Sequence, residues 1–546
     1  MPGEWEAFDI GVAARVIQHL SSGIYRTPGG AIKELVSNSY DAQASFVSID
    51  SGEPDHLQFS VVDDGIGLDE ELIRRSFAHI GASVKASPSG GYPKSKDRPI
   101  IGRFGIGVLA AAHVSHKIRF ETYPKGGDKG YECKLDLEPF FDMVNSVKTL
   151  EEVALGTAQF REIEKRPGNI GTKVELLDIR KDSNFHRAIT RAGKRSFVTV
   201  WPGSKDPKPD GGTAMEMFVR ATQEAGLLSI KRLSGRERLL WELGLICPVK
   251  YLDGGPIRRE LLKGAAETAV KEIVEEASAS AFNVFFDGIE LRKPILLPTL
   301  KSRRSYVDIA DPSIANEART WVIRFRDPKS KVAAVGYLVS QPHAVQPQEL
   351  QGLYSRIKGV GIGSYDPLLF SSLPGESPIL RVRVSGEIYL EGLDASINLD
   401  RSGFNPFSPE YNALEEAMQR VLAPPGGLLS DVREAIDDQA ERVKEVKQEH
   451  KAERTRNAVE NQARRRGMQV APRTQRPAPK PKSRVYHYPF VTIDDSAQTI
   501  EIDPKLTDQR LAKVILAVDE FLTGLSNSDE LRRDLSTKLR KILRAS

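Results

Sequence analysis

A segment near the N-terminus places three polar side chains at helical spacing. Glu34, Asn38 and Asp41 stand at i, i+4 and i+7, so in a helix all three project from one face. A carboxylate and an amide one turn apart suit a general base for water beside an oxygen ligand for Mg²⁺. A polar face turned toward solvent has the same pattern, and this segment alone does not separate the two interpretations.

An apolar strand ends in an acid and two spaced glycines in the segment FSVVDDGIG. Asp63 closes the strand, and Gly65 and Gly67 follow it. Binding loops are often attached to strand ends, and glycine allows the backbone to approach a ligand closely. An ordinary Asp-Gly turn is the alternative interpretation.

A glycine-rich turn runs directly into a helix-forming sequence in GRFGIGVLAAA. Gly102, Gly105, Ile106 and Gly107 belong to this turn, which would present backbone N–H groups and a positive helix end to a phosphate. No Gly-Lys-Ser/Thr follows, so the turn is not a Walker loop.

Together with a strand opened by Gly171 and Thr172, these segments resemble, in their order and spacing, the GHKL (Bergerat-fold) ATPases. This group includes gyrase B, the ninety-kilodalton heat-shock chaperones, MutL, the MORC proteins and the sensor histidine kinases. The resemblance covers residues 10–180, and the run SGIYRTPGGAIKELVSNSYDA is nearest to the MORC-like branch. It implies an α/β sandwich that holds ATP between its helices and a mixed sheet.

The resemblance also implies roles for the motif residues. Glu34 would be the general base and Asn38 the Mg²⁺ ligand. Sensor kinases generally lack this base, so its presence favours ATP hydrolysis over phosphoryl transfer to histidine. The remaining nucleotide contacts would be Asp41 beside the site, Asp63 on the adenine amino group, Thr172 supporting it, Gly65 and Gly67 near the base, Gly102, Gly105, Ile106 and Gly107 over the phosphates, and Ser83 and Lys85 in an ATP lid at 82–101.

A cation from a second domain is expected at the γ-phosphate, where it would stabilise charge in the transition state. The segment EGLDASINLDRSGFN resembles the middle-domain loop of the heat-shock chaperones, and on that resemblance Arg401 would make this contact. Lys293 and Lys358 are the alternatives, and a plain surface role for Arg401 remains open. Relatives of this kind are ATP-gated homodimers, in which residues 4–28 would be the exchanged segment.

The fold class predicted for the chain is α+β, because helical and strand patterns alternate without a regular βαβ repeat. Helices are expected at 31–44 and 70–80, and strands at 47–50, 58–63, 117–122, 131–137 and 172–177. The predicted organisation is a GHKL ATPase domain at 1–180, a mainly helical connector at 181–280, a ribosomal-S5-like transducer domain at 281–425, a long helix at 426–466, a basic proline-rich linker at 467–485 and a small C-terminal unit at 486–546.

Composition sets limits on these interpretations. The 546 residues are 40% hydrophobic and 28% charged, which is ordinary for a globular protein of several domains and excludes disorder along the whole chain. No apolar run is long enough to cross a bilayer and no signal peptide is evident. Cys133 and Cys247 are too few for a disulfide framework. A cytoplasmic protein without a membrane partner is therefore expected.

The net charge of +4 conceals a basic stretch. Residues 464–484 contain eight Lys or Arg and no Asp or Glu, which suits either salt-dependent contact with nucleic acid or a simple spacer. Three functions follow as hypotheses. The first is Mg²⁺-dependent ATP hydrolysis that opens and closes a dimeric clamp, with DNA as one candidate for what it holds. The others are a chaperone-like remodelling ATPase, whose client the sequence does not identify, and a nucleotide-sensing scaffold with little turnover.

Overall fold

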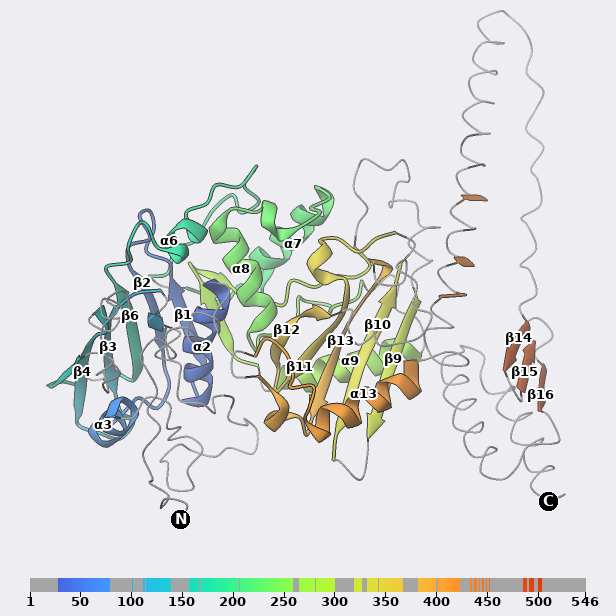
Figure 1. The fold of residues 1–546 in the computed structure, drawn as a ribbon. Coiled ribbons are helices and arrows are strands. Elements are labelled where there is room, and N and C mark those ends of the chain that lie inside the picture. The colour runs from blue at the N-terminus through green and yellow to red at the C-terminus, as the bar shows by residue number, and fades with distance from the viewer. Residues whose placement is uncertain are drawn as a thin grey trace, which may run out of the picture.

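The computed structural model contains three sheets with helices around the first two (Figure 1). It describes residues 28–78, 101, 111–112, 114–138, 157–165, 168–205, 207–258, 265–279, 281–299, 319–326, 331–341, 343–366, 382–398 and 401–422, single residues between 433 and 451, and the strands at 485–488, 491–494 and 499–502. Nearly all of the predicted basic linker, lid and exchange segment lies outside these residues.

The first sheet has eight strands in the order β5-β4-β3-β6-β2-β1-β7-β8. All neighbouring pairs are antiparallel except β1–β7, which explains why the sequence shows no βαβ repeat. The strands are β1 (Phe46–Asp50), β2 (Phe59–Asp63), β3 (Lys117–Tyr123), β4 (Lys129–Asp136), β5 (Thr157–Glu164), β6 (Gly171–Leu177), β7 (Asn283–Phe286) and β8 (Ile289–Glu290). Five of the eight were predicted within two residues at each end.

Helix α2 (Pro28–Asp41) packs beside α8 (Gly235–Ile246). Its apolar residues Ile32 and Val36 are fully buried. At its N-terminus the Gly29 amide donates to the buried Glu242 carboxylate of α8, which satisfies one of the N–H groups that a helix start leaves unpaired. The other helices of this part are α3 (Glu70–Ala78), α6 (Asn184–Ile189) and α7 (Thr213–Glu224).

The second sheet has five strands in the order β12-β11-β13-β10-β9. Helix α9 (Ala265–Ala279) contacts β9 and β10, and α13 (Pro409–Leu422) contributes Leu414 and Met418 to the core on the other face. The strands are β9 (Arg319–Arg326), β10 (Ala333–Ser340), β11 (Gly352–Ile357), β12 (Val360–Asp366) and β13 (Val384–Glu391). Strands β9 and β10 pair antiparallel over their whole length.

The predicted domain boundary at residue 281 is wrong. Strand β7 pairs in parallel with β1, so it belongs to the first sheet rather than to the transducer. The predicted connector at 181–280 likewise contributes to the hydrophobic core of the first sheet. A short apolar strand such as NVFF suits the interior of either sheet, and its sequence does not indicate which partner it pairs with.

Three strands are described in the C-terminal unit. They are β14 (Val485–Tyr488), β15 (Val491–Asp494) and β16 (Thr499–Ile502), and successive strands pair antiparallel. The described residues between 433 and 451 are helical, as predicted. Among the residues that the structure describes, no helix has the length and apolar character to cross a membrane.

Candidate functional site

The Asp63 carboxylate lies where β2 ends and β6 begins. One of its oxygens, Oδ1, accepts hydrogen bonds from the Gly65 amide at 2.9 Å and the Thr172 amide at 3.3 Å. The other, Oδ2, accepts from the Ser39 hydroxyl at 2.8 Å. Asp63 and Thr172 are direct partners in the β2–β6 register. The structure therefore brings Asp63, Gly65 and Thr172 together, as the resemblance implied, and adds Ser39 from α2.

Burial raises the pKa of Asp63, while the hydrogen bonds from Gly65, Ser39 and Thr172 oppose that rise. Only 8% of the residue is exposed. Each carboxylate oxygen has about two acceptor sites, and one site on Oδ2 remains after Ser39 is counted. A ligand N–H group, such as an exocyclic amine, would fit this acceptor.

The two glycines after Asp63 are required by the protein's own packing. Gly67 has φ +70°, and a Cβ there would stand 2.5 Å from the Tyr123 carbonyl oxygen. A Cβ on Gly65 would stand 2.8 Å from the Ala42 carbonyl oxygen and 2.9 Å from Asp63 Oδ1. Side chains at either position would displace the loop that carries Asp63.

The three residues of the predicted polar face of α2 differ in burial. Glu34 is partly buried and forms an ion pair with Lys33 at 2.7 Å, and the Lys33 side chain is only 4% exposed. Asn38, one turn later, is exposed. Asp41 is buried, and its Oδ1 accepts from the Ile101 amide at 2.7 Å. The three residues thus occupy three different environments: an ion pair, the helix surface and a contact with the segment that leads to Gly102.

Arg401 reaches the ATPase module from the second domain. Its guanidinium donates to the carbonyl of Ile101, the same residue whose amide is held by Asp41. Arg401 is 8% exposed and has φ +53°, and its backbone is fixed by bonds to Asn398 and Gly363. This contact joins residues 300 positions apart, immediately before the glycine-rich turn.

Lys293 lies in a buried cluster that also contains Tyr251 and Tyr389. Its ammonium is 4.0 Å from the centre of the Tyr251 ring and donates to the Tyr389 hydroxyl at 3.2 Å. Burial holds the pKa of Lys293 well below its usual range. Glu387 and Arg356 form a fully buried ion pair in the same cluster. The Lys293 side chain is therefore enclosed at the interface of the two sheets, and its assignment to the γ-phosphate stays a prediction.

Lys358, the other alternative, pairs with Asp394 at 2.6 Å. The predicted phosphate and lid residues Ser83, Lys85, Gly102, Gly105, Ile106 and Gly107 lie outside the described residues. Within the described part, no group of three or more His, Cys, Asp or Glu side chains could hold a metal ion.

Sequence reasoning missed two side chains that hold the predicted ones in place. Ser39 bonds Asp63, and Lys33 pairs with Glu34. The sequence carries a partial signal for both, because Lys33 adjoins Glu34 and Ser39 adjoins Asn38. Adjacent residues on a helix point in different directions, so neither was placed on the predicted face.

Comparison with known proteins gives partial matches. Residues 25–166 match the family described as "Histidine kinase-, DNA gyrase B-, and HSP90-like ATPase". The chaperone protein HtpG of Rickettsia bellii is 26% identical over 210 residues, which are 35% of this chain and 33% of HtpG. HtpG of Francisella tularensis subsp. novicida is 30% identical over 155 residues, 24% of each protein.

A protein of Herpetosiphon aurantiacus named "Putative type II restriction enzyme HgiDII" is 29% identical over 195 residues, 35% of this chain and 30% of that protein. The chain thus spans a third or less of the length of these curated relatives. The family match begins just before α2 and includes Glu34 and Asp63. Residues 25–166 therefore form a region similar to the GHKL ATPases, and the relatives of this region compared above include HSP90-like chaperones.

Proposed function

We propose that the chain binds Mg²⁺-ATP beside α2 and the end of β2, hydrolyses it, and uses the cycle to open and close a dimeric clamp. The observation that supports this proposal is the pair of hydrogen bonds that Ile101 makes with Asp41 and Arg401. Ile101 lies one residue before the glycine-rich turn. Because Ile101 contacts both Asp41 in the first domain and Arg401 in the second, closure of the turn over the phosphates would affect both domains at once.

The chemical roles follow from the described side chains. Lys33 forms an ion pair with the Glu34 carboxylate and fixes its direction, as a general base requires. Asp63 would orient the adenine through its remaining acceptor site. Asn38 would supply one oxygen ligand to Mg²⁺, which protein sites commonly hold through one or two side chains plus phosphates and water. The metal would neutralise charge on the phosphates.

Arg401 would exchange its contact with the Ile101 carbonyl for the γ-phosphate. A carbonyl is a neutral acceptor, and a phosphate offers a stronger charge-assisted bond. The exchange would release Ile101 from the second domain and couple the nucleotide to the position of that domain. Homodimer formation is part of the proposal because relatives with this module act as ATP-gated dimers.

Duplex DNA is our first candidate for what the clamp holds. The basic stretch at 464–484 and the similarity to a protein named as a restriction enzyme support it. Remodelling of a protein client is the second candidate, and the similarity to two HtpG chaperones favours it.

The test of hydrolysis is Glu34→Gln, with Glu224→Gln at an exposed position as the matched control. The variant should lose about 10²–10⁴-fold in ATP turnover and keep its ATP affinity, because the carboxylate acts on water rather than on the nucleotide. Turnover is measured by phosphate release and affinity by titration calorimetry. Unchanged turnover would remove Glu34 from the mechanism.

The clamp and its cargo are tested on the wild-type chain. Turnover per molecule should rise with protein concentration if the dimer is the active form, and a flat dependence argues against ATP-gated dimerisation. Stimulation of turnover by duplex DNA, and its loss on deleting 464–484, would favour the DNA clamp. Stimulation by an unfolded protein alone would favour the chaperone.

A further inference from the structure

Residues 180–208 carry an unusual concentration of positive charge. This segment contains eight Lys or Arg and two Asp, a net charge of +6, whereas the whole chain carries +4. It runs from the end of β6 through the short helix α6 to the residues before α7. The segment is separate from the basic stretch at 464–484.

The backbone of this segment is held to the body of the protein. Glu237, at the start of α8, accepts hydrogen bonds from the Val198 amide at 3.0 Å and from the Phe197 amide. The Gly235 amide donates to the Arg191 carbonyl at 2.8 Å. Glu237 itself is 1% exposed, so these bonds are shielded from water.

The far end of the segment is anchored as well. The Gly203 amide donates to the Asp287 carbonyl at 3.0 Å. The Trp201 ring lies 3.8 Å from the Arg236 guanidinium and packs edge-on against Phe286 at 5.9 Å. Although the segment is mostly irregular, its course is therefore set by buried groups, and its side chains are displayed on a preorganised surface.

The cations of this segment remain largely unneutralised. Arg180 lies 3.7 Å from Asp182, and this is the one ion pair that the segment makes among the described residues. On the first sheet, by contrast, Arg119 pairs with Glu175 at 2.9 Å and neighbouring cations are also paired. The exposed cations of the segment are Arg180, Lys181, Arg187, Arg191, Lys194, Arg195, Lys205 and Lys208.

The segment lies at the end of the ATPase module opposite the Asp63 site. Asp63 pairs with Thr172 at the start of β6, whereas the basic segment follows Leu177 at the end of that strand. Five residue steps along β6 separate Thr172 from Leu177, or about 17 Å. Figure 1 shows the connection between α6 and α7 on the upper side of the view, away from α3. A partner bound there would leave the nucleotide site open.

We propose that residues 180–208 form a contact surface for the phosphate backbone of duplex DNA. Spread-out cations, all but Arg180 without an ion pair to a described residue, on a fixed backbone match the dense, regular charge of a duplex. Trp201 is stacked within the protein and Phe197 lies 4.4 Å from the Arg195 guanidinium, so the aromatic rings are not free to stack on single-stranded bases. The surface would bind without sequence preference, because phosphate contacts carry no base information.

This inference deepens the DNA option of the proposed function and rests on it for its biological role. DNA binding can nevertheless be measured on the full chain without nucleotide, separately from turnover. A positive binding result with an inactive ATPase would refute only the proposed hydrolysis, and the reverse result would refute only this surface.

The experiment compares two triple variants of equal charge change. The test variant is Arg191→Glu with Lys194→Glu and Arg195→Glu. The control is Lys134→Glu with Arg220→Glu and Arg326→Glu, at exposed sites outside the segment. Affinity for a short fluorescein-labelled duplex is followed by anisotropy at about 50 and about 200 mM salt. Affinity that comes from phosphate contacts falls steeply between these two salt concentrations.

The test variant should bind at least about tenfold more weakly than the control, and the slope of log affinity against log salt should fall by about 3. The proposal would be overturned if the two variants bound the duplex equally well and the test variant kept the wild-type slope of log affinity against log salt. Displacement of the duplex by polyglutamate at equal charge concentration would also overturn it, by indicating an acidic protein partner. Near-ultraviolet circular dichroism identical to the wild type verifies that both variants are folded.

Discussion

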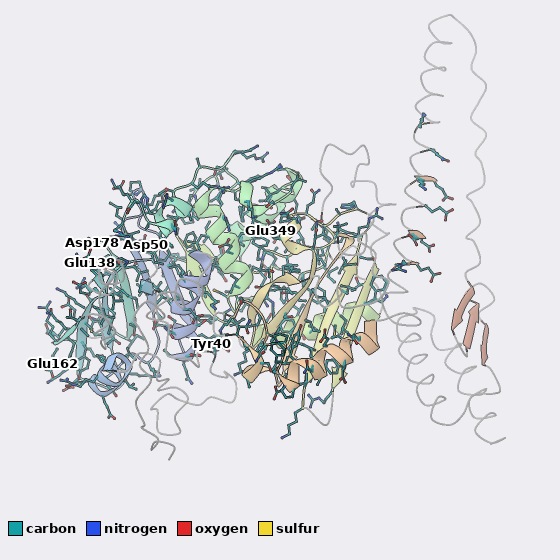
Figure 2. The ribbon with its side chains drawn as sticks, viewed as in Figure 1. Tyr40, Asp50, Glu138, Glu162, Asp178 and Glu349 are labelled. Carbon is teal, nitrogen blue, oxygen red and sulfur yellow. The ribbon has the colours of Figure 1, made fainter. Side chains whose placement is uncertain are left out.

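Loss of the Glu387 carboxylate should destabilise the junction between the two sheets. Glu387 on β13 forms a fully buried ion pair with Arg356 of β11. It also accepts hydrogen bonds from Tyr337 of β10 at 2.6 Å and from Tyr251, which follows α8. Figure 2 shows the described side chains on the elements of both sheets. Glu387→Gln removes the charge while nearly preserving the volume.

The magnitude follows from what the substitution leaves behind. Arg356 is 0% exposed and its Nη2 already has no partner, so neutralising Glu387 leaves a buried cation without its counter-charge. Breaking one side of such a pair costs about 3–5 kcal/mol. The two tyrosine hydroxyls lose a charged acceptor as well, but that loss overlaps with the first and does not add to it in full.

The sign of the pH dependence follows from the pKa of Glu387. Burial acts to raise this pKa, but Arg356 and Lys293 outweigh burial and hold it below its usual range. A carboxylate with a depressed folded pKa contributes its stability above its unfolded pKa and loses it as pH falls through the folded value. The difference between wild type and Glu387→Gln should therefore be full at neutral pH and shrink in acid.

The assay is urea unfolding followed by tryptophan fluorescence, with Trp321 of β9 reporting on the second sheet. Glu391→Gln is the matched control, because Glu391 lies on the same strand in an exposed pair 3.4 Å from Arg326. The control should cost less than about 1 kcal/mol. A cost below about 1 kcal/mol for Glu387→Gln would refute the reasoning, as would equal costs for the two variants.

Three further predictions concern single side chains. Asp63→Asn should weaken ATP binding about 10- to 100-fold, the value of one hydrogen bond to a charged group, and unchanged affinity by calorimetry would remove the adenine assignment. Arg401→Ala should lower turnover by about 10³-fold or more with a smaller effect on ATP affinity, and a fall in affinity alone would assign Arg401 to binding only. Burial raises the pKa of Cys133 to about 11 and that of Cys247 to about 12, so neither thiol should react with a disulfide reagent at neutral pH until the protein is unfolded, and rapid labelling of the native chain would contradict their burial.

Much of the first domain is predictable because its signals are local. Alternating burial along β3 and the apolar stretch that ends at Asp63 reflect the two-residue period of a strand. The spacing of Glu34, Asn38 and Asp41 reflects the helical period in the same way. Strand β5 was missed, and its mostly exposed residues explain why it lacks an apolar pattern.

Local pattern does not specify partners. The sequence by itself determined the order of the motifs, the general fold class and the concentration of basic residues at 464–484. Only the tertiary structure decided that β7 lies beside β1, that Ser39 holds Asp63, and that Arg401 contacts Ile101. The physical reason is that helix and strand periods arise from neighbouring residues, whereas these contacts depend on which distant surfaces bury each other most favourably.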